Sequence, residues 1–351
     1  MKTLQVLIKT LTSIPLTASW NLSALNEFKG KQDLYKNQSA EKLKKLKEHA
    51  VIESSISSNR IEGVTVENSR VKAVVFGNSK LRDRNEEEVR GYQNALRWVH
   101  QENQKIKINE KTILKLHEYC KGEIWDAGKF KEKQVDITEK FVDGTEKIRF
   151  KPPNVKESKI FLKKSNELWQ GELKEKTIPP LLLLAASNLD FLSIHPFRDG
   201  NGRVSRLLLL LQLYHLGYDI GKYMSIEKVI EDNKERYYET LKESSQNWHE
   251  GKNDIWPYAN FIFYILKEAY KKMDIRLQEL PNAKGSKTNL VIEYIESSIG
   301  QFSVADIKYH TPGVSIDLIR KVLKNLQKEQ RVVSLGRGRN AKWQVVPKPL
   351  D

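Results

Sequence analysis

The chain has 351 residues, of which 60 are Lys or Arg and 45 are Asp or Glu, so its formal net charge is +15. A hydrophobic fraction of 39% and a charged fraction of 30% exclude a disordered or fibrous chain and predict two or three globular domains. The single cysteine, Cys120, excludes an intramolecular disulfide and a cysteine-based zinc site. The N-terminus is a poor signal peptide and the leucine run 207–211 is too short to span a bilayer, so we expect a cytoplasmic protein without a membrane partner.

Helices dominate the prediction from the N-terminus onward. Residues 1–85 should form an N-terminal helical region, whose first 40 residues are the least readable and are expected to add a helical cap. The body, residues 86–280, shows apolar residues at spacings of three and four, which is the pattern of helices packed on one face. The expected helices of the body are 86–104, 109–122, 180–192, 202–217, 233–246 and 256–271. The helix 180–192 is almost entirely apolar and should be the buried centre.

One segment of the body breaks the helical pattern. Residues 130–153 contain two short alternating runs on either side of Asp143 and Gly144. Asp-Gly between alternating apolar residues is a strong signal for a β-hairpin. Pro152 and Pro153 end it.

The most informative string is HPFRDGNGRVSR, residues 195–206, which lies between two predicted buried helices. Gly200 and Gly202 bracket Asn201 and allow the backbone to approach a ligand closely. The helix that opens at Gly202 has a positive N-terminus that favours anions. This segment is therefore expected to bind phosphate groups.

Four side chains of the same string suit chemistry on a polyphosphate. Arg203 and Arg206 are one helical turn apart and can reach one polyphosphate with bidentate hydrogen bonds. Asp199 offers a hard oxygen ligand for Mg²⁺. His195 can accept a proton from an attacking hydroxyl near neutral pH. Together these groups predict phosphoryl or nucleotidyl transfer.

The string resembles the Fic family signature H-P-F-x-[DE]-G-N-G-R-x-x-R at every fixed position, and the likeness extends over roughly residues 40–270. Fic proteins are helical, and most transfer AMP from ATP to a Ser, Thr or Tyr hydroxyl of a target protein. The resemblance implies that ATP and Mg²⁺ are used. It implies that His195 is the general base and that Asp199 is the Mg²⁺ ligand. Asn201 and the backbone of Gly200 and Gly202 would hold the α- and β-phosphates. Arg203 would neutralise phosphate charge, and Arg206 would bind the γ-phosphate. Related Doc-type kinases carry Lys at the position of Gly202, so glycine favours AMP transfer.

Two further segments resemble parts of this family. The hairpin is similar to the family's flap, in which residues equivalent to Gln134, Val135, Asp136 and Ile137 hold the target chain by strand addition. The alternative is an edge hairpin without a partner. Asn233, Tyr237 and Tyr238 resemble a helix that lines the adenine pocket, although aromatic residues on a helix are equally expected in the core.

An inhibitory motif is also suggested by resemblance. Ser58-x-x-x-Glu62-Gly63 is similar to the family's [ST]-x-x-x-E-[GN] motif, placed before the core. The likeness implies that Glu62 pairs with Arg206, oriented by Ser58, and that ATP then binds only unproductively. Gly63 would end the inhibitory helix. The alternative is an ordinary helix end with a solvated glutamate.

The C-terminal segment is expected to be a separate domain. Residues 281–289 are small, polar and turn-rich, which predicts a linker. Helices at 290–299, 303–309 and 315–329, followed by strands at 331–333 and 342–346, match the layout of a winged helix in residues 290–351. Residues 284–346 carry 11 Lys and Arg against 5 Asp and Glu. Duplex DNA is therefore a candidate partner, through a set of basic residues formed by Arg320, Lys321, Lys324, Arg337 and Arg339. The alternative is a domain used for protein contacts or dimerisation, and a homodimer stays open.

The sequence thus predicts a mainly α protein: a helical Fic core with a β-hairpin flap and a small C-terminal winged helix-turn-helix domain. The predicted function is protein adenylylation (AMPylation), autoinhibited through Glu62 and Arg206. Two alternatives remain: a nucleotide-sensing, DNA-binding transcriptional regulator, or a de-AMPylating or toxin-like Fic enzyme.

Overall fold

The computed structural model describes residues 2–32, 40–77, 80–122, 124–140, 144–279, 286–298, 300–311, 314–336, 338 and 341–346. The chain separates into two compact units, one made of Met1–Asn37 and Leu43–Leu277 and the other of Gln38–Lys42 and Gln278–Asp351. Within these described ranges, no helix combines the length and apolar character needed to cross a membrane.

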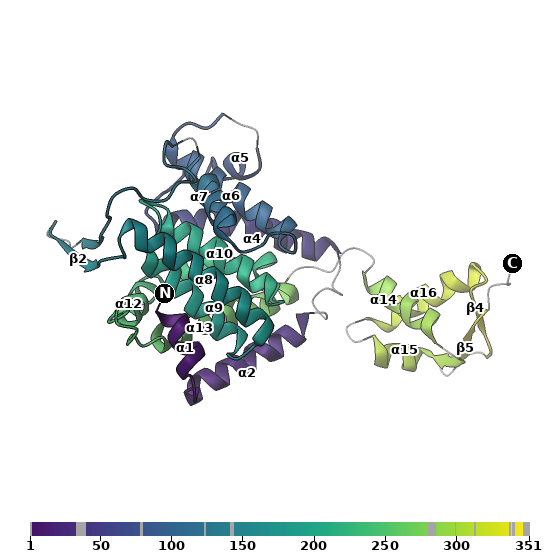
Figure 1. The fold of residues 1–351 in the computed structure, drawn as a ribbon. Coiled ribbons are helices and arrows are strands. Elements are labelled where there is room, and N and C mark those ends of the chain that lie inside the picture. Colours follow the sequence, from purple (N-terminus) through teal and green to yellow (C-terminus); the bar gives the residue numbers. More distant parts are fainter. Residues whose placement is uncertain are drawn as a thin grey trace. The chain divides into compact units, whose positions relative to one another are not determined.

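The larger unit is a helical body (Figure 1). The N-terminal helices and the loop 195–200 fall in this one unit. The helices up to residue 279 are α1 (Thr3–Thr10), α2 (Leu16–Gly30), α4 (Ala40–Ile61), α5 (Val71–Phe76), α6 (Arg84–Glu102), α7 (Glu110–Lys121), α8 (Val155–Glu175), α9 (Pro180–Ile194), α10 (Asn201–His215), the 3-10 turn η1 (Ile220–Lys222), α11 (Ile226–Asp232), α12 (Lys234–Ser245) and α13 (Trp256–Glu279).

Helix α9 forms the centre of this body, as its apolar sequence predicts. Every residue from Leu181 to Ile194 is buried, and α9 packs against α1, α8, α10 and α12. The charged Asp190 is fully buried within it. Its carboxylate accepts hydrogen bonds from the backbone N–H groups of Thr3 and Leu4 and from the Trp248 indole. Burial raises the pKa of Asp190, and these donors satisfy carboxyl oxygens that would be costly to bury unpaired.

The helices predicted for the body are confirmed with ends shifted by one or two residues, except that α13 runs to Glu279, eight residues beyond the predicted end at 271. Helix α8 was not predicted, because its many Lys and Glu residues obscure the apolar stripe. It begins with a capping box in which the Asn154 side chain accepts from the Glu157 N–H and the Glu157 side chain accepts from the Asn154 N–H. This N-x-x-E signal directly after Pro153 was available in the sequence. Helices α5 and α11 were also missed, since each is short.

The predicted hairpin is confirmed. Strand β1 (Ile137–Lys140) pairs antiparallel with β2 (Glu146–Phe150), and residues 141–143 lie outside the described residues. The ladder begins later than the sequence pattern suggested, and before it the side chain of Gln134 donates to the Pro152 carbonyl at 2.9 Å. An ion pair of 3.0 Å between Lys242 of α12 and Glu139 of β1 ties the hairpin to the body.

The smaller unit contains the predicted helices and hairpin and one further strand. Its elements are α14 (Ser286–Ser297), β3 (Gln301–Ser303), α15 (Val304–His310), α16 (Ile316–Lys328), β4 (Val332–Ser334) and β5 (Lys342–Val345). The antiparallel sheet has the order β3-β5-β4. The predicted linker 281–289 is wrong at its end, because α14 already begins at Ser286; residues 280–285 lie outside the described residues. Arg337 and Arg339 also lie outside them.

The core of the smaller unit is apolar and continuous. Buried side chains from each of its helices and from β3 and β4 meet there, among them Val291, Phe302, Ile307, Ile319, Leu323 and Val332. Burial on this scale is the usual source of stability for so small a unit. Helix α16 turns one apolar face inward, and its remaining faces are exposed.

Candidate active site

The loop between α9 and α10 holds an unusual backbone. His195, the residue after α9, has φ 49°, and Gly200, the residue before α10, has φ 83°. Asn201 closes the loop: its side-chain oxygen accepts from the Phe197 N–H at 3.0 Å and its side-chain nitrogen donates to the Phe197 carbonyl at 2.9 Å. Because Asn201 is only 2% exposed and both polar atoms of its amide bond Phe197, its side chain holds the loop closed.

A second histidine supports the loop from outside the motif. The His117 ring of α7 is stacked on Phe197 at a centroid distance of 3.9 Å. The Gly128 N–H donates to His117 Nδ1, so Nε2 carries the proton and donates to the Asp199 carbonyl at 3.0 Å. Burial lowers the pKa of His117 to about 4. His117 is therefore a neutral structural donor to the loop.

His195 lies half-buried on the wall of a cavity. Burial, followed by the positive charge of Lys131, lowers the pKa of His195 to about 4. At neutral pH the imidazole is thus uncharged and able to accept a proton.

Four charged side chains form a closed ring beneath the loop, which we call the charge ring. Lys121 of α7 contacts Asp199 Oδ2 at 2.5 Å and Glu88 Oε1 of α6 at 3.3 Å. Arg203 contacts Glu88 Oε2 at 2.6 Å and Asp199 Oδ2 at 3.7 Å. The side chains of Lys121, Arg203 and Glu88 are at most 5% exposed, whereas that of Asp199 is 55% exposed. Asp199 is therefore the member of the ring whose side chain is substantially exposed to solvent.

The ring keeps Asp199 ionised. Burial opposes its charge, but the Lys121 ammonium and then Arg203 lower the pKa of Asp199 to about 2. The Gly200 N–H also donates to Asp199 Oδ1 at 2.6 Å. The pKa of Glu88 is likewise lowered, since the charges of Arg203 and Lys121 outweigh its burial.

Glu62 stands over the start of α10. Its carboxylate accepts from Arg206 Nη2 at 2.8 Å, and a Cβ atom added to Gly202 would lie 2.1 Å from Glu62 Oε1. Ser58 completes the contact: Arg206 Nε donates to its Oγ at 2.8 Å and Nη2 to its carbonyl at 2.9 Å. Gly63 follows with φ 83°, where α4 has ended.

Arg206 is charged although it is 2% exposed. Burial alone would lower its pKa, but the negative charge of Glu62 outweighs this and raises the pKa above the ordinary value. Its Nη1 atom is buried without a hydrogen-bond partner among the described residues. Helix α10 also has no side-chain cap from any described residue. An uncapped helix N-terminus beside a guanidinium is a site for an anion.

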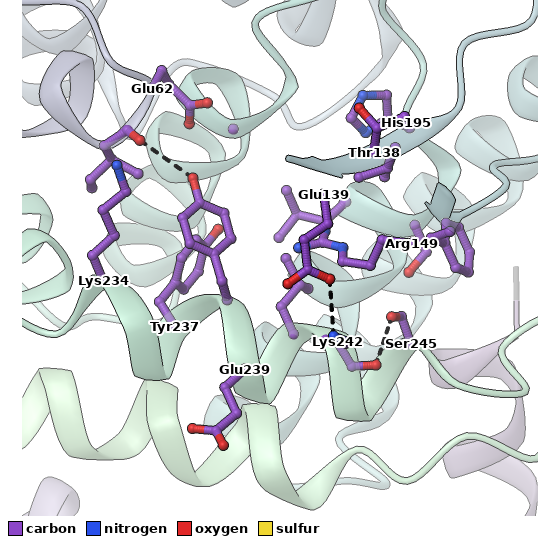
Figure 2. Close-up of a pocket in the computed structure, with 18 of the residues that line it drawn as sticks. Glu62, Thr138, Glu139, Arg149, His195, Lys234, Tyr237, Glu239, Lys242 and Ser245 are labelled. Atoms are coloured by element: carbon purple, nitrogen blue, oxygen red, sulfur yellow. Dashed lines mark hydrogen bonds and ion pairs between the residues drawn. The ribbon is translucent and has the colours of Figure 1, made fainter. Parts of the chain in front are cut away.

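Several of these groups face one cavity of about 1150 Å³. Figure 2 shows Glu62 and His195 on its wall, with Thr138 and Arg149 of the hairpin and Tyr237 of α12. Tyr238 also lines it, and its hydroxyl donates to the Ile61 carbonyl at 3.4 Å.

Some of the site residues predicted from the sequence line the cavity, and others do not. The cavity walls include His195, Asp199, Gly202, Glu62, Gly63, Tyr237, Tyr238 and Ile137. Gln134, Val135 and Asp136 are not among its lining residues. Asn233 is not either; its amide donates to the Val229 carbonyl at 2.9 Å.

Asp199 is the carboxylate that suits a divalent cation here. Within the part of the chain that the structure describes, no cluster of three or more His, Cys, Asp or Glu side chains could hold a metal. Mg²⁺ is commonly held by one or two carboxylates, with waters and substrate phosphates as its other ligands. The ionised and half-exposed Asp199 beside the cavity fits that pattern.

Sequence reasoning missed three supporting residues: Glu88, Lys121 and His117. Each lies on a helix outside the motif, where a charged or polar residue is expected to face solvent. No local pattern distinguishes them. The spacing of apolar residues by three and four in α6 and α7 predicted the two helices, but it did not predict which polar side chains turn inward.

A comparison with family models finds the Fic/DOC family over residues 107–213. A curated relative, "Protein adenylyltransferase Fic" of Drosophila yakuba, is 27% identical over 226 residues, which are 63% of this chain and 41% of the relative. The same protein of Drosophila persimilis is 26% identical over 232 residues, 64% of this chain and 41% of the relative. The chain thus spans about two fifths of the length of these relatives.

Solved structures share the fold. A Fic family protein from Desulfovibrio desulfuricans G20 has a TM-score of 0.62 at 20% identity, covering 97% of this chain and 98% of that one. A Fic domain containing signaling protein from Bacteroides thetaiotaomicron has a TM-score of 0.62 at 21% identity, covering 74% of this chain and 98% of that one. The fold of this mostly helical chain is therefore the one found in Fic proteins, and the Fic/DOC match covers its central loop.

Proposed function

We propose that this chain is a protein adenylyltransferase that transfers AMP from ATP to a Ser, Thr or Tyr hydroxyl of a target protein. The observation that carries the proposal is the shared cavity of His195 and the uncapped start of α10. A neutral base and an anion site facing one cavity are what nucleotidyl transfer to a hydroxyl requires. We assign the catalytic core to residues 86–280, with residues 1–85 in a regulatory role.

In the proposed reaction the target hydroxyl loses its proton to His195 as its oxygen attacks the α-phosphorus of ATP. The bond from the α-phosphorus to the bridging oxygen breaks, and pyrophosphate leaves. The backbone N–H groups at Gly200–Gly202 and the guanidinium groups of Arg203 and Arg206 oppose the phosphate charge. Asn201 maintains the loop through its two bonds to Phe197.

Asp199 would hold Mg²⁺, which neutralises charge on the phosphates when it is bound. The low pKa of Asp199, about 2, keeps the carboxylate ionised at neutral pH. Tyr237 and Tyr238 would bound the adenine side of the cavity. The segment from Gln134 to Ile137, which leads into β1, would receive the target chain by strand addition.

Glu62 would act as a built-in inhibitor. Its pair with Arg206 engages the guanidinium proposed for the γ-phosphate, and its carboxylate covers Gly202. A triphosphate has to displace this carboxylate to bind productively. The hydrogen bonds from Arg206 to Ser58 hold the inhibitory helix α4 against α10.

Labelling with ATP tests the proposal. The purified protein, incubated with ATP labelled in the α-phosphate and with Mg²⁺, should incorporate label into itself or into a protein of a lysate. The His195→Ala variant should bind ATP and incorporate none. Binding of ATP without any labelling would favour a nucleotide sensor, and release of AMP from a modified protein would favour a de-AMPylase.

A second proposed activity belongs to the smaller unit, which we interpret as a winged helix. Arg320, Lys321 and Lys324 are exposed on α16, which is the position of a recognition helix in such domains. The full chain should bind duplex DNA with an affinity that falls as salt rises, and replacing the three residues by Gln should weaken binding and flatten the salt dependence. Binding that is absent or independent of salt would favour protein contacts instead.

A further inference from the structure

The charge ring contains a cation that is already next to the proposed metal ligand. Lys121 Nζ lies 2.5 Å from Asp199 Oδ2, and the Lys121 side chain has no exposed surface. The ammonium is also held at 3.3 Å by Glu88 of α6, and α6, α7 and α10 pack against one another, so this buried side chain is held in place beside Asp199. Any cation that approaches Asp199 from the cavity therefore meets a carboxylate that already has a fixed counter-ion.

The formal charges of the ring cancel, since Lys121 and Arg203 balance Asp199 and Glu88. The adjacent pair of Arg206 with Glu62 is also neutral. Arg84 reaches Glu88 Oε1 at 3.1 Å from the exposed side and adds a further positive charge. A free divalent cation gains little from a neutral site and is repelled by an ammonium beside its only carboxylate ligand.

A cation that arrives with a triphosphate meets a different balance. The phosphates bring several negative charges to the start of α10, where Arg203 and the backbone N–H groups lie. Their oxygens also supply the further ligands that a single carboxylate lacks. The cation can then bind beside the ring, because the attraction between the cation and the phosphates exceeds the repulsion between the cation and Lys121.

We propose that Lys121 is a positioning residue and internal counter-cation: it orients Asp199 and keeps the site free of divalent cations until a nucleotide brings one. This proposal rests on the proposed function only for the assignment of Asp199 as metal ligand. It makes metal binding conditional on nucleotide through a residue of α7 that lies outside the loop motif.

The test measures Mn²⁺ binding without nucleotide, from the electron paramagnetic resonance signal of free Mn²⁺. Mn²⁺ is chosen because it takes the same oxygen ligands as Mg²⁺. The wild-type protein should bind Mn²⁺ weakly. Lys121→Met and Lys121→Gln, which leave the ring with one net negative charge, should each bind Mn²⁺ at least about tenfold more tightly.

Three variants serve as controls. Lys121→Arg keeps the charge and should behave as the wild type. Adding Asp199→Asn to Lys121→Met should remove the gain in Mn²⁺ affinity. Combining Lys121→Met with Glu88→Gln makes the ring neutral again and should also remove this gain. Melting curves and circular dichroism establish that each variant is folded.

Equal Mn²⁺ affinity in the wild type and in folded Lys121→Met or Lys121→Gln would overturn the proposal, as would a gain that survives Asp199→Asn. If neither Lys121→Met nor Lys121→Gln folds, Glu88→Gln provides the test in the opposite direction. Its ring carries one net positive charge, so Mn²⁺ binding in the presence of a non-hydrolysable ATP analogue has to weaken, and unchanged binding overturns the proposal. Since none of these measurements uses AMP transfer, they can fail or succeed independently of the labelling test.

Discussion

Replacing Glu62 by Gly should raise the proposed AMP transfer. The carboxylate of Glu62 is 30% exposed and bonds a guanidinium that is 2% exposed, at 2.8 Å. A hydrogen bond between charged groups in such a setting contributes about 1.5–3 kcal/mol. Arg206 keeps its two bonds to Ser58, so the variant loses one restraint and retains the position of the guanidinium.

That free energy sets the expected size of the effect. If a triphosphate has to break the Glu62–Arg206 contact, its removal should raise AMP incorporation roughly 10- to 100-fold at limiting ATP, because about 1.4 kcal/mol corresponds to a factor of ten. Glu62→Gln keeps the bulk of the side chain over Gly202 and loses its charge, so it should give an intermediate increase. The assay is incorporation of label from ATP into the protein itself, with Mg²⁺ present.

Two controls make the result decisive. His195→Ala in the Glu62→Gly background should abolish the label, which separates AMP transfer from adventitious binding. ATP affinity should be measured for each variant by calorimetry, to show that nucleotide binding itself is retained. Equal label in the wild type and in Glu62→Gly would refute the inhibitory role of this contact.

Two further predictions follow from contacts around the loop. Gly202→Ala should lower the melting temperature of the wild type, because the added Cβ would lie 2.1 Å from Glu62 Oε1. The same substitution should have little effect on the melting temperature in the Glu62→Gly background. Equal effects in both backgrounds of this double-mutant cycle would contradict the close approach of Glu62 to Gly202. The pKa of His117 is lowered by burial from 6.5 to about 4, so the unfolded chain binds the proton more tightly. Its contribution to stability is then complete above pH 6.5 and is lost as the pH falls toward 4, by up to about 3 kcal/mol. Urea unfolding of His117→Gln should show a shallower decline over this range, and an unchanged decline would argue against the buried neutral imidazole.

Local sequence was sufficient for much of the fold. The apolar run of α9 predicted a buried central helix, and Asp143-Gly144 between alternating residues predicted the hairpin. These features depend on the intrinsic periodicity of helices and strands and on the turn chemistry of a few residues. Helix α8 shows where that approach is weak, since its capping signal at Asn154 was clear but its apolar stripe was diluted by charge.

Local sequence also determined the nature of the loop. Gly200 adopts the positive φ that glycine favours, and Asn201 follows where its short amide can bond the backbone of Phe197. These contacts span only four residues and are therefore encoded locally, whereas His117 of α7 adds the further support from outside the string. The placement of a histidine before the loop and an open helix start after it was therefore readable without any tertiary information.

Only the tertiary structure decided which distant charges meet at this loop. Glu62 is 144 residues from Arg206 in the sequence, and the resemblance to a family motif, not any local pattern, led us to expect the two to pair. Nothing at all indicated that Lys121 and Glu88 would join Asp199 and Arg203. On an isolated amphipathic helix a lysine or glutamate is expected to face water, and it becomes part of a site only when another helix brings an opposite charge within reach. That pairing depends on how α6, α7 and α10 pack, and packing is a property of the whole core, which the sequence of any one helix does not contain.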